Sequence, residues 1–310
     1  MELCIFVEPQ QGTTYERVCA LARHAEALGY TGFFSSDHLL AMGGRDGLPG
    51  PLDTWTTLAG LARDTTRLRL GPLVTPVTFR HPGLLAVTVA QVDAMSGGPL
   101  EVGLGAGWYE AEHHAHGLAF PPAGERLTML EEQLAVLAGW WSTPAGERVD
   151  VTGLNTALVA SPALPKPVQQ PHPPVILGGR GPRRTPRLAA RYADEFNVTF
   201  SPVEVFVEQR DRVRAACDEA GRDPATMRFS VALVLCCGDD EATFRRRADA
   251  IGRAPDELRQ NGACGTPDEV AATLRAYRDA GAARVYLQTL DDTDHDHLSL
   301  VAEAVAPALR

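Results

Sequence analysis

The sequence has no excess of basic residues and no long apolar run. Its 310 residues include 39 Asp and Glu but only 29 Lys and Arg, which gives a formal net charge of −10 at pH 7. A protein that binds a phosphate backbone needs a basic surface, so we expect no nucleic acid as a partner. No apolar run reaches the roughly 18–20 residues of a membrane-spanning helix, so we expect no membrane partner either.

Cysteine pairs of the CxxC type are also missing. The six cysteines are Cys4, Cys19, Cys217, Cys236, Cys237 and Cys264, and their spacing matches no zinc pattern. The first residues enter a strand pattern directly, without the basic start and apolar stretch of a signal peptide. Reduced thiols in a chain of this length are typical of the cytosol, so the sequence predicts a cytoplasmic protein.

Two histidine-rich segments are the only hint of a metal. His113–His116 and Asp294–His297 lack a spacing that would direct three ligands to one point, as a zinc site requires. The segment after the first expected strand, which begins Glu8-Pro9, offers no histidine pair. We therefore predict no bound metal.

Eight short apolar runs alternate with amphipathic helical segments. They are Leu3–Val7, Gly32–Asp37, Leu68–Val74, Leu100–Leu104, Pro174–Gly178, Asp194–Val198, Phe229–Cys236 and Arg284–Gln288. Eight strands separated by helices predict an α/β protein of the (β/α)8 type, a TIM barrel, here as a single domain over 1–310. The alternative, a doubly wound sheet, usually has a GxGxxG turn after its first strand, whereas Glu8–Gly12 contains one glycine.

Two segments depart from the regular alternation. Residues 142–173 are rich in Pro, Thr, Gly and Val and predict an insertion with one hairpin, and residues 237–263 predict a variable region. Three helices are expected to start at capping boxes, because Thr13, Ser201 and Thr266 each precede a glutamate by three positions.

Functional groups of such barrels gather at the carboxyl ends of the strands. There the sequence places Glu8, Ser35–His38, Thr75 with Arg80, and the glycine-rich segment Gly103–Gly107. Trp108 and Tyr109 follow that segment directly and could wall an aromatic cofactor.

The segment Gly178–Arg184 has the clearest physical meaning. Its glycines allow close approach of a ligand to the backbone, and a helix begins directly after it, where free N–H groups attract anions. Arginine binds phosphate through two parallel hydrogen bonds. We therefore predict an anion site that includes Gly178, Gly179, Arg180, Gly181, Arg183 and Arg184.

Several motifs, taken in order, resemble the luciferase-like flavin and deazaflavin oxidoreductases, the bacterial luciferase superfamily. They are Phe34–His38, Leu73–Pro82, Gln91–Gly98, Gly103–Glu112, Pro165–Pro174 and Ala193–Asn197. Within that superfamily the chain resembles the branch that uses the deazaflavin coenzyme F420. The family fold is a (β/α)8 barrel, which agrees with the strand count.

The resemblance implies roles for particular residues. Asp37 and His38 correspond to an acid–histidine pair beside the deazaflavin ring, and Leu73–Val74, with Thr75 next to it, to a bulge, often with a non-proline cis peptide, behind the ring. Gly107–Glu112, with Trp108, Tyr109 and Glu112, corresponds to a loop over the ribityl chain and ring edge, and Gly179–Arg184 to the cofactor phosphate site. Some members carry a carboxylate at the position of Trp108, so their sugar-phosphate substrate is not implied.

These observations predict an F420-dependent reductase that transfers a hydride between the reduced coenzyme and a C=C or C=N bond of a small metabolite. His38 is the first candidate for the acid or base, because a histidine ring titrates near neutral pH. Glu8 and Glu110 are second candidates, and Asp37 would orient His38 or bond the ring. The alternatives are an FMN-dependent monooxygenase that uses dioxygen and a non-catalytic flavin-binding protein.

A homodimer is expected, because most soluble oligomers have two-fold symmetry and members of the resembled family commonly pair through barrel helices. Trp55, Leu58 and the helix around Leu85–Val92 would form its buried contacts.

Overall fold

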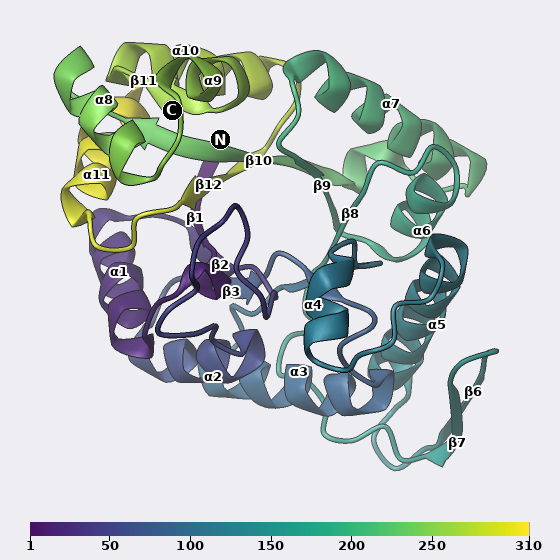
Figure 1. Cartoon of the computed structure of the whole chain (residues 1–310). Helices are drawn as coiled ribbons and strands as arrows, with labels where there is room; N and C mark the ends of the chain where they lie inside the picture. Colours follow the sequence, from purple (N-terminus) through teal and green to yellow (C-terminus); the bar gives the residue numbers. More distant parts are fainter. Residues whose placement is uncertain (310) are drawn as a thin grey trace.

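Parallel strands form a ring at the centre of the molecule, as the computed structural model of residues 1–309 shows (Figure 1). The ring consists of β1 (Glu2–Val7), β2 (Gly32–Ser35), β3 (Arg69–Pro72) continued by β4 (Thr75–Pro76), β5 (Val102–Gly105), β8 (Val175–Gly178), β9 (Glu195–Thr199), β10 (Arg228–Cys237) and β12 (Arg284–Thr289). All eight expected strands are present, and the predicted (β/α)8 barrel is confirmed.

The ring closes between β3 and β5. Neighbouring strands pair in parallel in the order β3-β2-β1-β12-β10-β9-β8-β5-β4. A parallel bridge between Leu70 and Leu100 joins the two ends, and the Glu101 amide donates to the Leu70 carbonyl over 2.8 Å. Every strand of the ring is therefore paired on both sides, which leaves no exposed sheet edge.

Helices enclose the ring (Figure 1). They are α1 (Tyr15–Leu28), α2 (Thr54–Asp64), α3 (Pro82–Ser96), α5 (Ala123–Ser142), α6 (Arg184–Tyr192), α7 (Val203–Glu219), α8 (Glu241–Ala250), α9 (Pro255–Asn261), α10 (Pro267–Asp279) and α11 (His295–Leu300). The short helix α4 (Glu110–Ala115) lies apart from them at one end of the barrel. Short helical turns are η1 (Pro9–Gln11), η2 (Pro224–Thr226), η3 (Val301–Val305) and η4 (Ala306–Leu309). Their apolar faces pack on the strands to form one large core. Within residues 1–309, no helix combines the length and the apolar character needed to cross a membrane.

The expected insertion contains an antiparallel hairpin of β6 (Val149–Thr152) and β7 (Ala157–Ser161). The segment 237–263 forms α8 and α9 and leads to β11 (Ala263–Gly265), which pairs with the end of β10.

One predicted capping box is confirmed and two are not. Thr266 and Glu269 form the complete box at the start of α10. The cap of α1 is Thr14 and not Thr13, whose hydroxyl donates to Asp292 instead. Ser201 does not cap α7, because its hydroxyl donates to the Thr199 carbonyl and Pro202 takes the cap position.

The amino-terminal end of the barrel is filled by a buried ionic cluster. Arg284, with no exposed side chain, pairs with Glu101 and Glu195, and the Tyr286 hydroxyl donates to Glu195 over 2.6 Å. Burial raises the pKa of Glu195, whereas Arg284 and Arg69 outweigh burial and lower the pKa of Glu101. The side chains of this cluster fill the amino-terminal end of the barrel, so we expect a ligand site at the carboxyl-terminal end.

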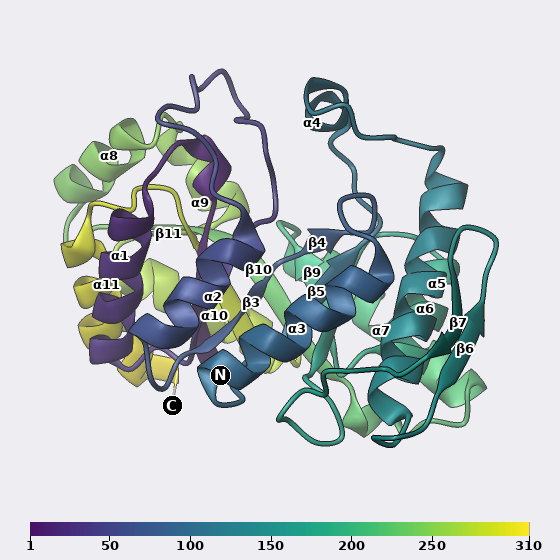
Figure 2. The same cartoon turned by 90° about the horizontal axis from the view of Figure 1, so that it is seen from below.

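At the carboxyl-terminal end of the barrel, long loops connect the strands to the helices that follow them. Figure 2 shows α4 and the loop between β2 and α2 projecting from one end of the barrel, while both termini lie near the opposite end. The projecting end holds the carboxyl ends of the strands, where the sequence placed the functional residues.

Candidate functional site

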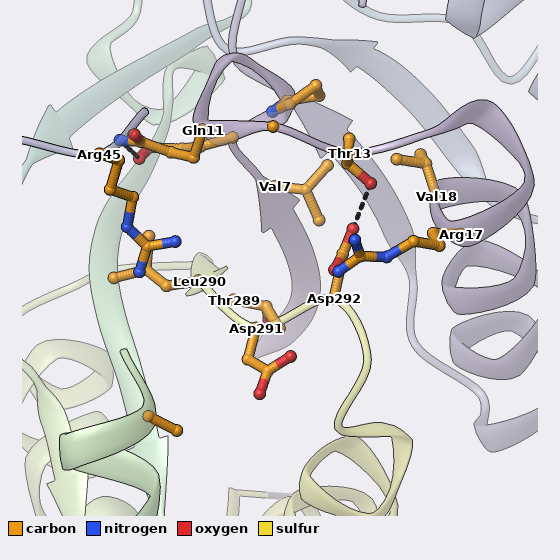
Figure 3. A pocket seen from close by; sticks show the side chains of 14 residues that line it. Val7, Gln11, Thr13, Arg17, Val18, Arg45, Thr289, Leu290, Asp291 and Asp292 are labelled. Carbon is orange, nitrogen blue, oxygen red and sulfur yellow. Dashed lines mark hydrogen bonds and ion pairs between the residues drawn. The ribbon is translucent and has the colours of Figure 1, made fainter. Parts of the chain in front are cut away.

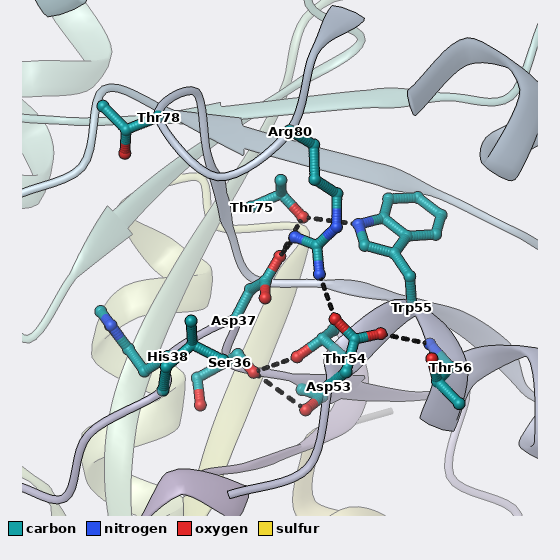
Figure 4. A network of polar contacts seen from close by, with 12 residues as sticks. Ser36, Asp37, His38, Asp53, Thr54, Trp55, Thr56, Thr75, Thr78 and Arg80 are labelled. Carbon is teal, nitrogen blue, oxygen red and sulfur yellow. Dashed lines mark hydrogen bonds and ion pairs between the residues drawn. The ribbon is translucent and has the colours of Figure 1, made fainter. Parts of the chain in front are cut away.

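Asp37 is the centre of a polar network at the end of β2. Its Oδ2 accepts a hydrogen bond from the Thr75 hydroxyl over 2.8 Å and an ion-paired one from Arg80 (Figure 4). Arg80 also pairs with Asp53, which caps α2, and Trp55 donates its indole N–H to Thr75 over 2.9 Å. The network thus ties the ends of β2 and β3 to the start of α2.

One side of the Asp37 carboxylate is not used by the protein. Only 1% of the residue is exposed, and its Oδ1 has no hydrogen-bond partner among the described residues. Burial raises the pKa of Asp37 even though Arg80 and Thr75 favour the charged form. A buried polar atom without a partner is costly in a folded protein, so this oxygen is suited to meet a donor from a bound ligand.

His38 points away from this network, as Figure 4 shows. Its ring Nδ1 lies 2.9 and 3.1 Å from the two carboxylate oxygens of Glu112, and the Leu39 amide donates to the same carboxylate over 3.0 Å. The Glu112 side chain is only 1% exposed and that of His38 is 17% exposed. The carboxylate that contacts His38 is therefore Glu112 of α4. Asp37, which was expected to orient His38 or to bond the ring, does not contact His38 and instead binds Arg80 and Thr75.

Aromatic rings stand beside His38. Gly107, with a φ of 77° that suits glycine, turns the chain out of β5 into Trp108 and Tyr109. The Trp108 ring stacks on Tyr109 at 5.3 Å between centroids and lies nearly perpendicular to the His38 ring at 5.7 Å, and 65% of Trp108 is exposed. The Tyr109 hydroxyl donates a hydrogen bond to the Ala41 carbonyl over 3.2 Å. These rings form one wall of the barrel mouth.

The bulge implied by the resemblance is present between β3 and β4. The Leu73–Val74 peptide bond is cis, and both residues belong to the small apolar cluster inside the barrel that contains Phe34 and Ile176. Thr75, fully buried, follows directly and contacts Asp37. Leu73, Val74 and Thr75 therefore lie in the barrel next to the Asp37 network.

The glycine loop after β8 turns tightly over the first turn of α6. Gly179 has a φ of 140°, and a Cβ placed on Gly181 would lie 2.6 Å from the Thr185 hydroxyl. No side chain caps α6 at its cap residue Arg183, so the amides of its first turn face this loop. A helix start of this kind attracts anions.

The arginines of this loop are not equally available. Arg180 donates through Nη2 to the Thr199 and Phe200 carbonyls and to Ser201, and Arg184 donates to Gly124 and Thr128 and pairs with Glu131. Arg183 is exposed and has no side-chain partner among residues 1–309. Among the described residues all donors of Arg183 are therefore unused, whereas Arg180 is held through Nη2 and Arg184 through both Nη1 and Nη2.

The two second candidates for the acid or base differ in position. Glu8 follows β1 and lines a polar cavity of about 170 Å³ with Arg45, Asp291 and Asp292 (Figure 3). Glu110 is exposed and lies 3.7 Å from His114 on the surface of α4. The structure therefore brings Glu8 to the barrel rim but does not bring Glu110 to His38.

Two partners of the site were not assigned from the sequence. Asp53 was not singled out, although an aspartate directly before a predicted helix is a common cap. The sequence places Arg80 after the third expected strand but indicates no partner for it. No local pattern pairs Arg80 with Asp37, because their contact depends on how the loops after β2 and β4 fold over the barrel.

Comparison with known proteins decides the family. The profile of the family described as "Luciferase-like monooxygenase" matches residues 1–259. The chain belongs to the luciferase-like family. The resemblance drawn from the sequence motifs is confirmed, and this protein is an enzyme of that family.

Curated relatives of this luciferase-like protein include proteins named for F420. It is 29% identical over 236 residues to the "F420-dependent hydroxymycolic acid dehydrogenase" of Mycobacterium tuberculosis, covering 74% of this chain and 61% of that protein. It is 34% identical over 177 residues to the "F420-dependent glucose-6-phosphate dehydrogenase" of Microbacterium testaceum, covering 56% and 50%. The chain thus spans about half the length of the curated relatives it matches.

Among solved structures, the luciferase-like protein is similar to an "F420-dependent secondary alcohol dehydrogenase in complex with an F420-acetone adduct". The TM-score is 0.86 over 100% of this chain and 99% of the other, at 19% sequence identity. At this identity the likeness shows the shared barrel fold.

Proposed function

We propose that this protein is an F420-dependent oxidoreductase that transfers a hydride between the reduced deazaflavin and a C=C or C=N bond of a small metabolite. The observation that carries the proposal is the arrangement at the ends of β2 and β3. Asp37, a buried carboxylate with an unused oxygen, contacts Thr75 directly after the Leu73–Val74 bulge, and the next residue, His38, is held by a second carboxylate. The relatives named for F420 dependence support the same cofactor.

The residues present fit a deazaflavin. The Asp37 Oδ1 has no partner among the described residues, and the tight glycine loop at the start of α6, with Arg183 beside it, suits a phosphate. Trp108 and Tyr109 would cover the ring edge from the loop after β5. When bound, the deazaflavin supplies the hydride chemistry, while the protein binds and orients the reactants and moves a proton.

Within this proposal His38 holds the proton. Its ring lies at the mouth with 17% of the side chain exposed, so it can reach a substrate and exchange with solvent. Glu8, on the rim beside the cavity of Figure 3, is a second group within the same mouth. The substrate-binding surface would come from the loops 40–51 and 108–122 and from segment 237–263.

The test is anaerobic mixing of the protein and reduced F420 with pools of small metabolites, followed by the recovery of oxidised F420 absorbance. We expect oxidation of the coenzyme that depends on one pool and needs no oxygen. An FMN-dependent monooxygenase is the second candidate, favoured by the description of the matching family. It would instead consume oxygen with reduced FMN and leave reduced F420 unchanged.

We also propose a homodimer, but not through the contacts expected from the sequence. Trp55, Leu58, Leu85 and Val92 are all buried within the core of one chain and cannot form an interface. Pairing through the same helices would use the exposed Leu84 and Met95 of α3. Light scattering that gives a particle of 33.3 kDa would contradict the dimer.

A further inference from the structure

We propose that Glu112 is a positioning residue: its carboxylate holds the proton of His38 on Nδ1 and thereby leaves Nε2 as the nitrogen that works on the substrate. The inference rests on the proposed function for the reaction in which Nε2 takes part, but the tautomer is a property of the protein alone.

The hydrogen-bond inventory of the two groups fixes the tautomer. An ionised carboxylate can only accept, and both Glu112 oxygens lie within 3.1 Å of the His38 Nδ1. Nδ1 must then carry a hydrogen. The Leu39 amide uses the same carboxylate as its acceptor, so the carboxylate is met by donors from His38 and from the backbone directly after it.

The surroundings of Glu112 give it no other positive partner. Among the described residues it forms no ion pair with a lysine or arginine, and only 1% of its side chain is exposed. A buried carboxylate is costly unless it is paired and hydrogen-bonded. The hydrogen bonds from the His38 Nδ1 and from the Leu39 amide are the ones that satisfy this carboxylate, so Glu112 and His38 hold each other in place.

Contacts of the neighbouring residue on α4 hold Glu112 in place. The next residue, His113, is fully buried, with Nε2 2.6 Å from the Thr78 hydroxyl and Nδ1 2.8 Å from the Tyr109 carbonyl. The short helix α4 is thereby anchored to the loop after β4, and Glu112, which directly precedes His113, reaches His38 and Leu39 after the end of β2. Glu110, by contrast, lies on the exposed surface of the same helix.

The other titratable groups around His38 do not compete for Nδ1. Asp37, its neighbour in the chain, is bound by Arg80 and Thr75, and Tyr109 uses its hydroxyl on the Ala41 carbonyl. Trp108 meets the ring through its edge contact and cannot titrate. Glu112 is therefore the group that determines which ring nitrogen of His38 carries the hydrogen.

The proton balance of the reaction follows. When a hydride has reached one atom of the substrate double bond, the other atom takes the Nε2 proton of the imidazolium, and its new bond forms as the N–H bond breaks. His38 is left neutral with its Nδ1 hydrogen still on Glu112, and a solvent proton restores Nε2–H. In the reverse direction Nε2 accepts the proton.

The direct test is the 15N spectrum of the His38 ring in the protein without cofactor, assigned by comparison with His38→Asn. At a pH where the ring is neutral, we expect the signals of a protonated Nδ1 and an unprotonated Nε2. In Glu112→Gln, whose amide can donate as well as accept, we expect a mixture of both tautomers. Glu125→Gln, which removes an exposed carboxylate at the start of α5, is the control and should leave the His38 signals unchanged.

Two further readouts distinguish positioning from a merely structural role. We expect Glu112→Gln to lower turnover with reduced F420 by roughly 10–100-fold, because the amide no longer fixes the His38 hydrogen on Nδ1 and Nε2 is then not always in the state that the proton transfer needs. F420 affinity should change by less than two-fold. A protonated Nε2 in the unaltered protein, or a Glu112→Gln variant with unchanged tautomer signals, would overturn the proposal. The expected tautomer without any F420 turnover would instead contradict the proposed function alone.

Discussion

At the scale of single residues, two carboxylates at the barrel mouth have different partners, and the sequence alone does not show which of them contacts His38. Asp37 is adjacent to His38 in the chain but bonds Arg80, whereas Glu112 lies 74 positions away and contacts the ring. The motifs named Asp37, His38 and Glu112 as site residues, and the structure brings all three to the same end of the barrel. Their pairing depended on the fold of α4 over the mouth, which no local pattern describes.

Replacing His38 tests its part in proton transfer. We predict that His38→Ala lowers turnover by roughly 10²–10⁴-fold, the usual contribution of a general acid or base, with cofactor affinity near that of the parent. Because alanine leaves the buried Glu112 carboxylate with only the Leu39 amide, His38→Asn is the better-matched variant: it keeps a donor near the Nδ1 position. Steady-state rates measured on both folded variants decide the matter, and parental turnover in His38→Asn would remove His38 from the mechanism.

The pair of Asp37 and Arg80 makes a prediction about stability. Arg80→Leu leaves a buried carboxylate without its cation, and removing one partner of such a pair costs roughly 3–5 kcal/mol. Urea unfolding at neutral pH measures this loss. The pKa of Asp37 is already raised by burial, so the loss should shrink as the pH falls and the carboxyl binds a proton in the folded state.

Two comparisons make the Arg80 prediction specific. Adding Asp37→Asn to Arg80→Leu removes the stranded charge and should recover part of the stability, whereas Arg63→Leu, an exposed arginine of α2, should have little effect. If Arg63→Leu and Arg80→Leu lowered the free energy of unfolding equally, the ion pair of Arg80 with Asp37 would contribute no more to stability than an exposed arginine does.

At the scale of elements, the sequence predicted where strands and helices occur better than how each one starts or ends. The expected strand Leu68–Val74 ends at Pro72, and Leu73 and Val74 lie between it and the short strand β4. Ser201 has the spacing of a capping box, yet its hydroxyl bonds the Thr199 carbonyl and Arg180. Tertiary partners of this kind compete with local patterns, which is why only the Thr266 box formed as expected.

The start of α11 makes the stability of the protein depend on pH. His297 accepts a hydrogen bond from the Cys237 amide over 2.8 Å, and burial, together with Arg247, lowers its pKa to about 4. A neutral ring in the folded state means that the unfolded chain binds an extra proton between pH 6.5 and about 4. The contribution is therefore complete above pH 6.5 and is lost as the pH falls, by roughly 3 kcal/mol in total.

The measurement is the free energy of unfolding in urea at several pH values between 4.5 and 6.5. We predict a steady decrease toward acid pH in the unaltered protein and a flatter curve in His297→Gln, whose side-chain oxygen can still accept from Cys237. The lowered pKa of Asp294, the cap of α11, affects stability only at more acidic pH. Parallel curves for the two proteins would contradict the assignment to His297.

At the scale of the whole molecule, the alternation of eight apolar runs was sufficient to predict the barrel, because each strand of a closed parallel sheet is buried on both faces. The same patterns could not separate a helix face that packs on the barrel from one that meets another chain. Trp55, Leu58 and Leu85 are apolar and regularly spaced for the first reason. Apolar spacing reports that a residue is buried, but not by which partner.

The central claim, that the cofactor is F420, is tested most directly by calorimetric titration of F420 and FMN at two ionic strengths. F420 carries a tail of carboxylates beyond its phosphate, whereas FMN ends in its phosphate, so we predict tighter binding of F420 at the arginine-rich loop and weaker binding at higher salt, which would screen these charges. Arg183→Ala should cost ~1–3 kcal/mol of binding free energy, as expected for a charge-assisted hydrogen bond. Arg191→Ala, the same change at the far end of α6, is the control. FMN binding as tight as that of F420, or F420 affinity unaltered in Arg183→Ala, would contradict the account and favour the monooxygenase.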